Sequence, residues 1–379
     1  MKIAIWWNIP CKSIVPVARE LANFENNEIK FISQSDLSES RKSLGWELPN
    51  FGNAEYKVLP EINYESEIEK ILNSNYDIHI FNGVYLFPKI RYALDLARKK
   101  NIPFGVISEA YHNPYTGFKR VLKTIFTRCI TPFRVFPRIQ NAKFILSASG
   151  NSFKPFSHLG WKKEQFFPFG YFPENEGLSL KKKEQNKTLQ LLCTGYITKN
   201  KGQELLIRAL KSIKNSEIKF HCTITGFGPE EETIKKLIND LNLVNEVTLT
   251  GVVGDSELNT IKSKTDLLIA PGYEEPWGIR INEAILAHTP VLVSDGIGAC
   301  ELIYKSKAGK VFKSGDINSL IEELEYLLNE NNLLIAKENV KQYADRISPK
   351  AAAIYLYDVI CFTLNKVKSK PTPVWLQDN

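Results

Sequence analysis

The chain has 379 residues, of which 43% are hydrophobic and 24% are charged, and its formal net charge is +7. This length favours two domains, and the composition excludes a disordered or fibrous chain. Six widely spaced cysteines, with no Cys-x-x-Cys or Cys/His cluster, exclude a zinc ribbon and a disulfide framework and favour free thiols in a reducing cytoplasm.

Short apolar runs predict strands in the first half, and the stretches between them predict helices. The predicted strands are 2–6, 28–33, 77–81, 104–108 and 143–147, and the predicted helices are 15–24, 89–100 and 117–129. These strands are apolar almost throughout, as in a parallel sheet that is buried on both faces. The alternation predicts a doubly wound α/β fold.

The charged stretch 181–187 has no apolar residue and predicts a linker, after which the alternation starts again. The second set of strands is predicted at 188–194, 218–225, 246–250, 266–270 and 290–294, with helices at 202–213, 230–241, 255–263, 279–288, 317–329, 333–344 and 349–366. We therefore expect domains at 1–180 and 187–350 and a final helix and tail at 351–379. Ligands of such sheets bind beyond the carboxyl ends of the strands, and two facing sheets would share one cleft.

Two carboxylates flank a helix start after the predicted strand 266–270. Glu275 and Glu283 are eight residues apart, about 2.2 helical turns, so Glu275 precedes the helix and Glu283 lies within it. The first-turn amides of Gly278 and Ile279 are then available to bind an anion, aided by the helix dipole. Carboxylates suit sugar hydroxyls. The amides and the two carboxylates together predict a site for a phosphate and a sugar. The alternative is an ordinary capped helix with a solvated Glu275.

The run Glu-Pro-Trp-Gly from 275, with Asn-Glu-Ala from 282, resembles the Glu-x7-Glu donor motif of family 4 (group 1) retaining glycosyltransferases of the GT-B fold. Three further segments resemble that family in the same order, at 194–202, 226–229 and 251–253. The resemblance implies two facing Rossmann-like domains, with the acceptor bound by the first and the nucleotide sugar by the second. It also implies that the last helix crosses back onto the first domain.

Site roles follow from the resemblance, position by position. Lys201 neutralises the donor diphosphate, and Glu275 binds the donor sugar, so both are expected to be catalytic. Glu283 binds the ribose, and Val253 holds the base through its backbone. The remaining expected donor-binding residues are Gly195, Tyr196, Gly226, Trp277, Gly278 and Ile279.

A lysine and aimed amides stabilise the charge that develops on a leaving diphosphate. No Asp-x-Asp motif occurs in a suitable loop, so we expect a metal-independent site without a cofactor. The family usually has arginine where this chain has Tyr196, and that cation is missing from its usual position. Lys199 and Arg280 are the two alternatives for supplying it.

The first half offers a weaker site at Glu109 and His112, which follow the strand 104–108. Members of the family place a polar residue here, near the donor sugar, so either residue is a candidate for catalysis. The alternative is a structural or merely exposed histidine. The loop 6–10 lacks the glycines that the family often has there. The resemblance implies that the acceptor attacks the donor sugar on the same face from which the diphosphate departs. It implies no enzymic nucleophile.

No acidic residue occurs between Glu109 and Glu164, whereas ten lysines and arginines do. Within this stretch an apolar stripe recurs at helical spacing, at Phe118, Val121, Leu122, Ile125, Phe126 and Cys129. The basic residues Lys119, Arg120, Lys123 and Arg128 lie off the stripe. A basic amphipathic helix is typical of a membrane-surface element or a site for an anionic acceptor. The alternative is a stripe that faces the core; no nucleic-acid motif occurs.

The sequence thus predicts a retaining hexosyltransferase acting on a nucleotide sugar and a glycan or lipid-linked acceptor, in bacterial polysaccharide or lipopolysaccharide assembly. No signal peptide and no spanning segment are expected, so the predicted location is cytoplasmic, with a peripheral position on the inner membrane face as the alternative. The main alternative is a non-catalytic nucleotide-sugar-binding or scaffold protein. An epimerase or phosphorylase on the same fold is a further alternative, although no cofactor-binding lysine motif of a phosphorylase was found.

Overall fold

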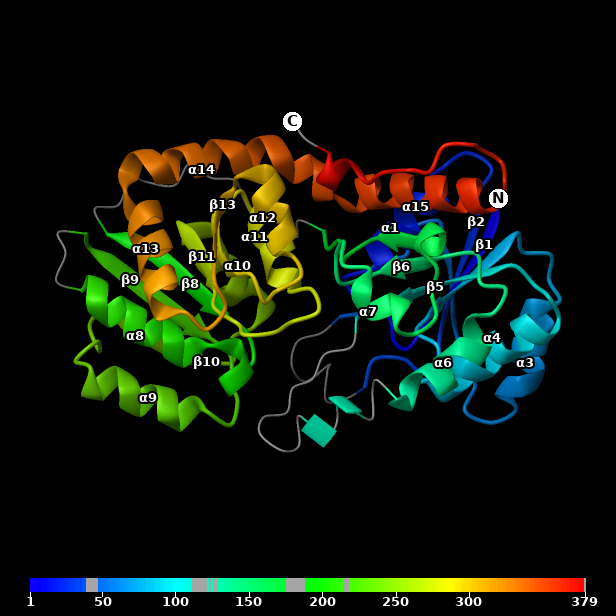
Figure 1. Ribbon diagram of the computed structural model, residues 1–379, viewed down its shortest axis with the longest axis horizontal. Helices are drawn as coiled ribbons and strands as arrows, with labels where there is room; N and C mark the ends of the chain where they lie inside the picture. The colour runs from blue at the N-terminus through cyan, green and yellow to red at the C-terminus, as the bar shows by residue number, and fades with distance from the viewer. Residues whose placement is uncertain are drawn as a thin grey trace. The chain divides into compact units, whose positions relative to one another are not determined.

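The computed structural model describes residues 1–38, 47–110, 121–122, 124–125, 129–174, 188–214 and 218–377. Two compact units divide the chain. The first comprises Met1–Glu174 and Ser348–Val374, and the second comprises Asn175–Ile347 and Trp375–Asn379. Each unit is an α/β structure built on its own parallel sheet (Figure 1).

The first unit contains a seven-stranded sheet in the order β3-β2-β1-β4-β5-β6-β7. Its strands are β1 (Lys2–Trp7), β2 (Glu28–Ser33), β3 (Glu55–Val58), β4 (Ile78–Asn82), β5 (Phe104–Ser108), β6 (Ile145–Ser147) and β7 (Phe166–Pro168). Its helices are α1 (Val15–Ala22), α3 (Tyr64–Leu72), α4 (Pro88–Lys99), α6 (Thr131–Ile139), α7 (Lys154–Ser157), η1 (Lys163–Gln165) and α15 (Pro349–Thr363). The strand order reverses at β1, because β1 pairs in parallel with both β2 and β4. This is the doubly wound pattern expected from the sequence.

The late helix α15 belongs to the first unit and packs against α1 (Figure 1). Pro349 occupies its first turn, and Ser348 caps it by accepting a hydrogen bond from the amide of Ala351. Phe24, just after α1, meets Tyr357 of α15 edge to face. The expectation that the last helix crosses back onto the first half is confirmed.

The second unit contains a six-stranded sheet in the order β10-β9-β8-β11-β12-β13. Its strands are β8 (Leu189–Thr194), β9 (Phe220–Thr225), β10 (Val247–Gly251), β11 (Leu267–Ala270), β12 (Val291–Ser294) and β13 (Gly309–Phe312). Its helices are η2 (Lys199–Lys201), α8 (Gln203–Ile213), α9 (Glu231–Asp240), α10 (Asp255–Lys264), α11 (Ile279–Leu286), α12 (Cys300–Ser306), α13 (Ile317–Leu328), α14 (Glu330–Tyr343) and η3 (Ala344–Ile347), and η4 (Val374–Leu376) lies at the unit boundary. An apolar core packs residues of β8, β9 and β11 against α8 and α13.

Several elements escaped the sequence analysis for physical reasons. The edge strand β3 is partly exposed and reads Glu-Tyr-Lys-Val, which gives no apolar run to detect. The helix α12 has seven residues, too few to show a clear period. The predicted linker 181–187 and most of the predicted helix 117–129 lie outside the described residues. Among those that are described, no helix is both long and apolar enough to cross a bilayer.

Candidate functional site

The carboxyl end of β11 leads into a tight turn that begins helix α11. Gly278 caps the helix in the left-handed region, with φ of 99°. A Cβ there would lie 2.6 Å from the Cγ2 of Ile297, so the turn needs glycine for both conformation and space. The amides of Ile279 and Arg280 lack acceptors within the helix, as at any helix start, whereas the Ile281 amide donates to Gly278 O at 3.0 Å. The predicted helix start is therefore confirmed.

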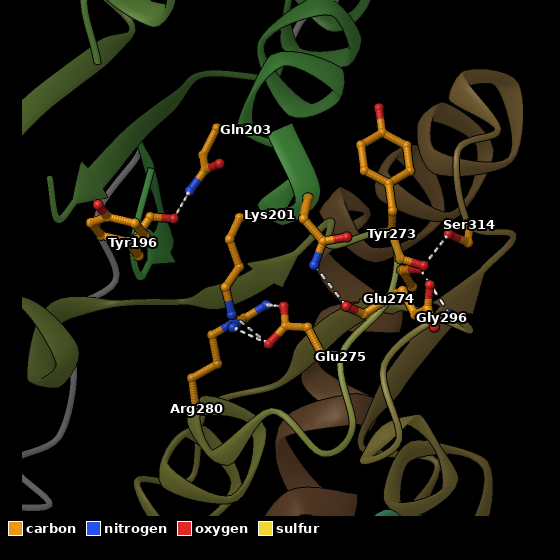
Figure 2. A network of polar contacts seen from close by, with 11 residues as sticks. Tyr196, Lys201, Gln203, Tyr273, Glu274, Glu275, Arg280, Gly296 and Ser314 are labelled. Carbon is orange, nitrogen blue, oxygen red and sulfur yellow. Dashed lines mark hydrogen bonds and ion pairs between the residues drawn. The ribbon is translucent and has the colours of Figure 1, made fainter. Parts of the chain in front are cut away.

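A buried cluster of three charges lies beside this helix start (Figure 2). Arg280 binds Glu275 with both ends of its guanidinium, Nη1 to Oε2 at 2.9 Å and Nη2 to Oε1 at 2.5 Å. Lys201, in η2, donates from Nζ to Oε2 of Glu275 at 2.7 Å. Glu275 and Arg280 are each only 9% exposed, whereas the Lys201 side chain is 26% exposed. The lysine is thus the member of the cluster that a ligand reaches first.

The cluster carries two cations and one carboxylate. Burial alone would raise the pKa of Glu275, but Arg280 and Lys201 outweigh burial and hold that pKa below its ordinary value. Burial lowers the pKa of Lys201, and repulsion from Arg280 lowers it further, against the attraction of Glu275. The surplus positive charge sits at the positive end of the α11 dipole. An incoming anion would therefore be stabilised here.

Backbone contacts on two sides fix the loop that carries Glu275 (Figure 2). Asn200 donates its side-chain amide to the carbonyl of Glu274 at 2.7 Å. On the other side, the amide of Glu275 donates to Gly296 O, and the amide of Gly298 donates to Glu275 O. Cβ atoms at Gly296 and Gly298 would lie about 2 Å from neighbouring carbonyl oxygens, 2.0 and 2.1 Å away. The sequence analysis missed this support, although the two spaced glycines after β12 were a usable signal.

Of the two alternatives for the second cation, Arg280 lies in the cluster and Lys199 does not. Tyr196 is 49% exposed and packs edge-on against Phe227, with ring centroids 5.1 Å apart, so position 196 brings no charge. Lys199 is exposed and has no recorded contact with the cluster among the described residues. A Cβ at Gly195 would lie 3.9 Å from Arg280 Nη1, which places the guanidinium beside the end of β8.

The other predicted donor-binding residues lie at the same edge of the sheet. Gly195 and Gly226 directly follow β8 and β9, and a Cβ at Gly226 would lie 2.1 Å from Gly195 O. Val253 follows β10 and is half-buried. Trp277 is 1% exposed and donates its indole N–H to Asn282 at 2.8 Å, so its side chain supports the turn from inside. The structure therefore places the Trp277 side chain in the core.

Glu283 lies on α11 and pairs with a lysine that the sequence did not suggest. Lys262, on α10, donates from Nζ to Oε2 of Glu283 at 2.7 Å. Both residues line a small hollow with Thr194 and Arg280. The pairing joins positions 21 residues apart on different helices, and no motif marks it.

A separate cavity of about 470 Å³ lies at the carboxyl edge of the first unit's sheet. Its lining is mostly apolar and aromatic, with a few polar groups; the lining includes Trp7, Asn8, Asn82, Phe87, Glu109 and Trp161. Glu109 Oε1 accepts a hydrogen bond from the Tyr171 hydroxyl at 2.7 Å. Burial and the nearby Glu109 raise the pKa of Tyr171 well above its ordinary value. The predicted residues His112, Lys119, Arg120, Lys123 and Arg128 lie outside the described residues.

Residues 176–347 match the family model of the glycosyl transferases group 1. A GDP-mannose-dependent alpha-(1-6)-phosphatidylinositol monomannoside mannosyltransferase of Mycobacterium tuberculosis is 29% identical over 153 residues, and the match covers 38% of this chain and 40% of that relative. Over nearly the whole chain, the fold is similar to that of Anabaena HepE in complex with UDP, with a TM-score of 0.69, 15% identity, and coverage of 97% and 100%.

The lipopolysaccharide outer core galactosyltransferase WaaB is also similar in fold, with a TM-score of 0.65, 15% identity, and coverage of 94% of this chain and 100% of that one. The curated relative therefore aligns over well under half its length, whereas the solved structures align throughout. Two doubly wound units and the matched region agree with the resemblance seen in the sequence. The chain has the GT-B fold, and its residues 176–347 match the glycosyl transferases group 1 family.

Proposed function

We propose that this protein is a retaining glycosyltransferase that moves a hexose from a nucleotide-diphosphate sugar to a glycan or lipid-linked acceptor. The observation that carries the proposal is the cluster of Lys201, Glu275 and Arg280 at the start of α11. The family match and the relatives named for mannosyl and galactosyl transfer support the same reaction class. Polysaccharide or lipopolysaccharide assembly is the setting that fits these relatives.

Each charged group has a task in this reaction. The departing nucleoside diphosphate gains negative charge, which Lys201 and the first-turn amides of α11 stabilise in a site mostly shielded from water. Glu275 accepts hydrogen bonds from the donor sugar, and Glu283 accepts them from the ribose. The backbone around Val253 holds the base. Because lysine and amides supply the positive charge, the proposal needs no metal ion.

The cavity of the first unit is proposed to take the acceptor. Its aromatic walls suit the apolar face of a sugar ring or the start of a lipid, and its polar groups orient hydroxyls. Glu109 is the acidic group among the described residues that line it. The hydroxyl of Tyr171 orients that carboxylate. A role for His112 stays a prediction.

The test of this function is transfer by Glu275→Gln, measured as release of nucleoside diphosphate from a panel of nucleotide sugars with an acceptor extract. Glutamine keeps the shape but removes the charge that holds Lys201. We expect transfer to fall at least ~100-fold, as for loss of a transition-state contact, while nucleotide binding persists. Glu204→Gln, an exposed change on α8, is the matched control and keeps full activity.

The main alternative is a protein that binds nucleotide sugars without transferring them, and the uncharged Tyr196 is the feature that favours it. Wild-type protein that binds a nucleotide sugar but releases no nucleoside diphosphate with any acceptor would establish that alternative. Equal turnover by wild type and Glu275→Gln would contradict the proposed site.

We also propose that the first unit contacts an anionic membrane surface. The described members of the predicted apolar stripe, Val121, Leu122, Ile125 and Cys129, are exposed rather than packed into the core. In α6, Thr131, Val135 and Ile139 face inward, and Phe133 is 81% exposed on the opposite side.

Charge complementarity identifies the proposed occupant of this surface. Four exposed lysines, Lys143, Lys154, Lys162 and Lys163, follow in the acid-free stretch. The ring of Phe136 packs over Gly160, which connects α6 to the turn before Lys162. Exposed aromatic and aliphatic side chains with excess positive charge suit the headgroup region of an anionic bilayer.

Co-sedimentation with vesicles tests this contact. We expect binding to vesicles that contain phosphatidylglycerol, little binding to pure phosphatidylcholine, and a several-fold loss with Phe133→Ser. Ile62→Ser is the matched control, since Ile62 is 79% exposed but lies outside this surface. Equal binding by wild type and Phe133→Ser would overturn the proposal, and so would a dimer in solution that Phe133→Ser dissociates.

A further inference from the structure

Arg280 occupies an unfavourable position unless the site uses it. It is the second residue of α11, where the helix dipole opposes a cation, and its side chain is about nine-tenths buried. Burying a guanidinium costs free energy that a paired carboxylate must offset. Glu275 provides that partner, but Lys201 binds the same carboxylate. The cluster therefore contains one cation more than the pairing of Glu275 requires.

The two cations hold Glu275 in different ways. Arg280 binds both carboxylate oxygens in a bidentate pair, whereas Lys201 binds Oε2 alone. A bidentate pair fixes orientation as well as charge, and a lysine contact fixes neither to the same degree. Arg280 is also the more deeply buried of the two. When an anion arrives, Lys201 is the cation that leaves Glu275 at the smaller cost.

We propose that Arg280 is a positioning residue of the donor site, which keeps Glu275 ionised and oriented so that Lys201 is free to bind the donor diphosphate. This inference rests on the proposed function. It explains how the site works with an uncharged residue at position 196, because Arg280 supplies the fixed cation beside the end of β8. Arg280 acts through Glu275 and Lys201, and need not touch the donor.

A specific consequence follows for a variant without this guanidinium. In Arg280→Met, Glu275 has only Lys201 as its charged partner. The carboxylate of Glu275 and the donor diphosphate then compete for the ammonium group of Lys201. Affinity for a nucleoside diphosphate then falls, while affinity for the matching nucleoside changes little. The pKa of Glu275 also rises, since burial is opposed by one cation instead of two. The acid limb of the kcat/KM profile moves to higher pH.

The experiment is calorimetric titration of wild type, Arg280→Met, Arg280→Lys, Lys201→Ala and the double variant Lys201→Ala/Arg280→Met. The ligands are whichever of UDP, GDP, ADP and dTDP binds wild type, and its nucleoside. We expect Arg280→Met to weaken diphosphate binding at least ~10-fold, with partial rescue in Arg280→Lys. In the Lys201→Ala background the same change has little further effect, because the two residues act through one carboxylate. Arg208→Met, at an exposed arginine of α8, is the control.

The outcomes separate this inference from the proposed function. If no nucleotide binds wild type, the proposed function fails and this inference fails with it. If wild type binds but Arg280→Met and wild type show the same ratio of diphosphate to nucleoside affinity, only the role of Arg280 is overturned. Equal losses in the wild-type and Lys201→Ala backgrounds overturn it as well. Should Arg280→Met not fold, Arg280→Lys decides by the same ratio and by the shift of the acid limb.

Discussion

The two units share one architecture but differ in the loops that follow the carboxyl ends of their strands. In the second unit, glycine turns bring backbone segments into close contact and hold Glu275 among cations. In the first unit, the same edge opens into a mostly apolar cavity, in which the carboxylate of Glu109 accepts a hydrogen bond from a tyrosine hydroxyl. A doubly wound sheet thus fixes where a ligand binds, whereas the loops decide which chemistry it meets.

The largest expected effect concerns the charge cluster of the second unit. Lys201→Met removes the exposed cation, and turnover is expected to fall by ~10² to 10³, as when one donor to a developing oxyanion is lost. Lys199→Met, two residues earlier and exposed, is the matched control. Comparable losses in both variants, measured as initial rates at saturating donor, would show that the cluster does not differ from an ordinary lysine surface.

Glycine turns distinguish the second unit's edge, and Gly226→Ala tests them. Gly226 has φ of 127°, and its Cβ would lie 2.1 Å from Gly195 O, so a side chain must displace backbone. We expect a loss of about 2–4 kcal/mol in unfolding free energy, as for strained backbone combined with overpacking. Urea denaturation measures it. Gly254→Ala, where a Cβ meets nothing within 4 Å, is the control and leaves the midpoint nearly unchanged.

Acidic pH should lower the stability of the first unit, because this unit buries a neutral histidine. Burial lowers the pKa of His79 to about 3, and its Nδ1 accepts a hydrogen bond from the Trp6 indole. Below pH ~6.5 the unfolded chain binds a proton at His79, whereas the folded chain keeps this histidine neutral. The free energy of unfolding therefore falls as the pH drops from ~6.5 toward ~3. The slope is at most about 1.4 kcal/mol per pH unit.

Denaturant unfolding at pH 7 and pH 5 measures this slope. His79→Gln keeps a side-chain acceptor for Trp6 but does not titrate, so its stability should change less between the two pH values. An identical pH dependence in wild type and His79→Gln would assign the acid sensitivity to other groups.

The smallest effect is expected at the first unit's cavity. Tyr171→Phe removes the hydroxyl that orients Glu109 and leaves the ring in place. We expect the acceptor KM to rise a few-fold while the donor KM stays constant, since the two ligands are proposed to bind different units. A change in the donor KM of the same size would break the assignment of one ligand to each unit.

The sequence predicted the second unit's site better than the first unit's. Glu275, Gly278 and Lys201 lie in short, ordered motifs, and the helix start they imply is where the structure has it. Arg280 was one of two open alternatives, because sequence spacing does not show which lysine or arginine points inward. No sequence motif marks the ion pair of Lys262 with Glu283, because the two residues lie on separate helices.

In the first unit, Glu109 and Tyr171 are 62 residues apart in the sequence but contact each other at the cavity. A local sequence pattern does not predict a contact over such a separation. The strands could be predicted from their apolar runs because both faces of the sheet are buried. Trp277 was expected to bind the donor, but its neighbourhood in the motif could not reveal that the ring turns into the core.

The most direct test of the central claim is a thermal-shift series with UDP, GDP, ADP, CMP and dTDP on wild type and Lys201→Ala. A ligand at 100 times its dissociation constant adds ~2.7 kcal/mol to stability, which is readily visible in a melting curve. The account predicts that one nucleoside diphosphate raises the wild-type melting temperature and that Lys201→Ala loses most of this shift. A wild-type protein that none of the nucleotides stabilises, or a shift that Lys201→Ala keeps in full, would contradict it.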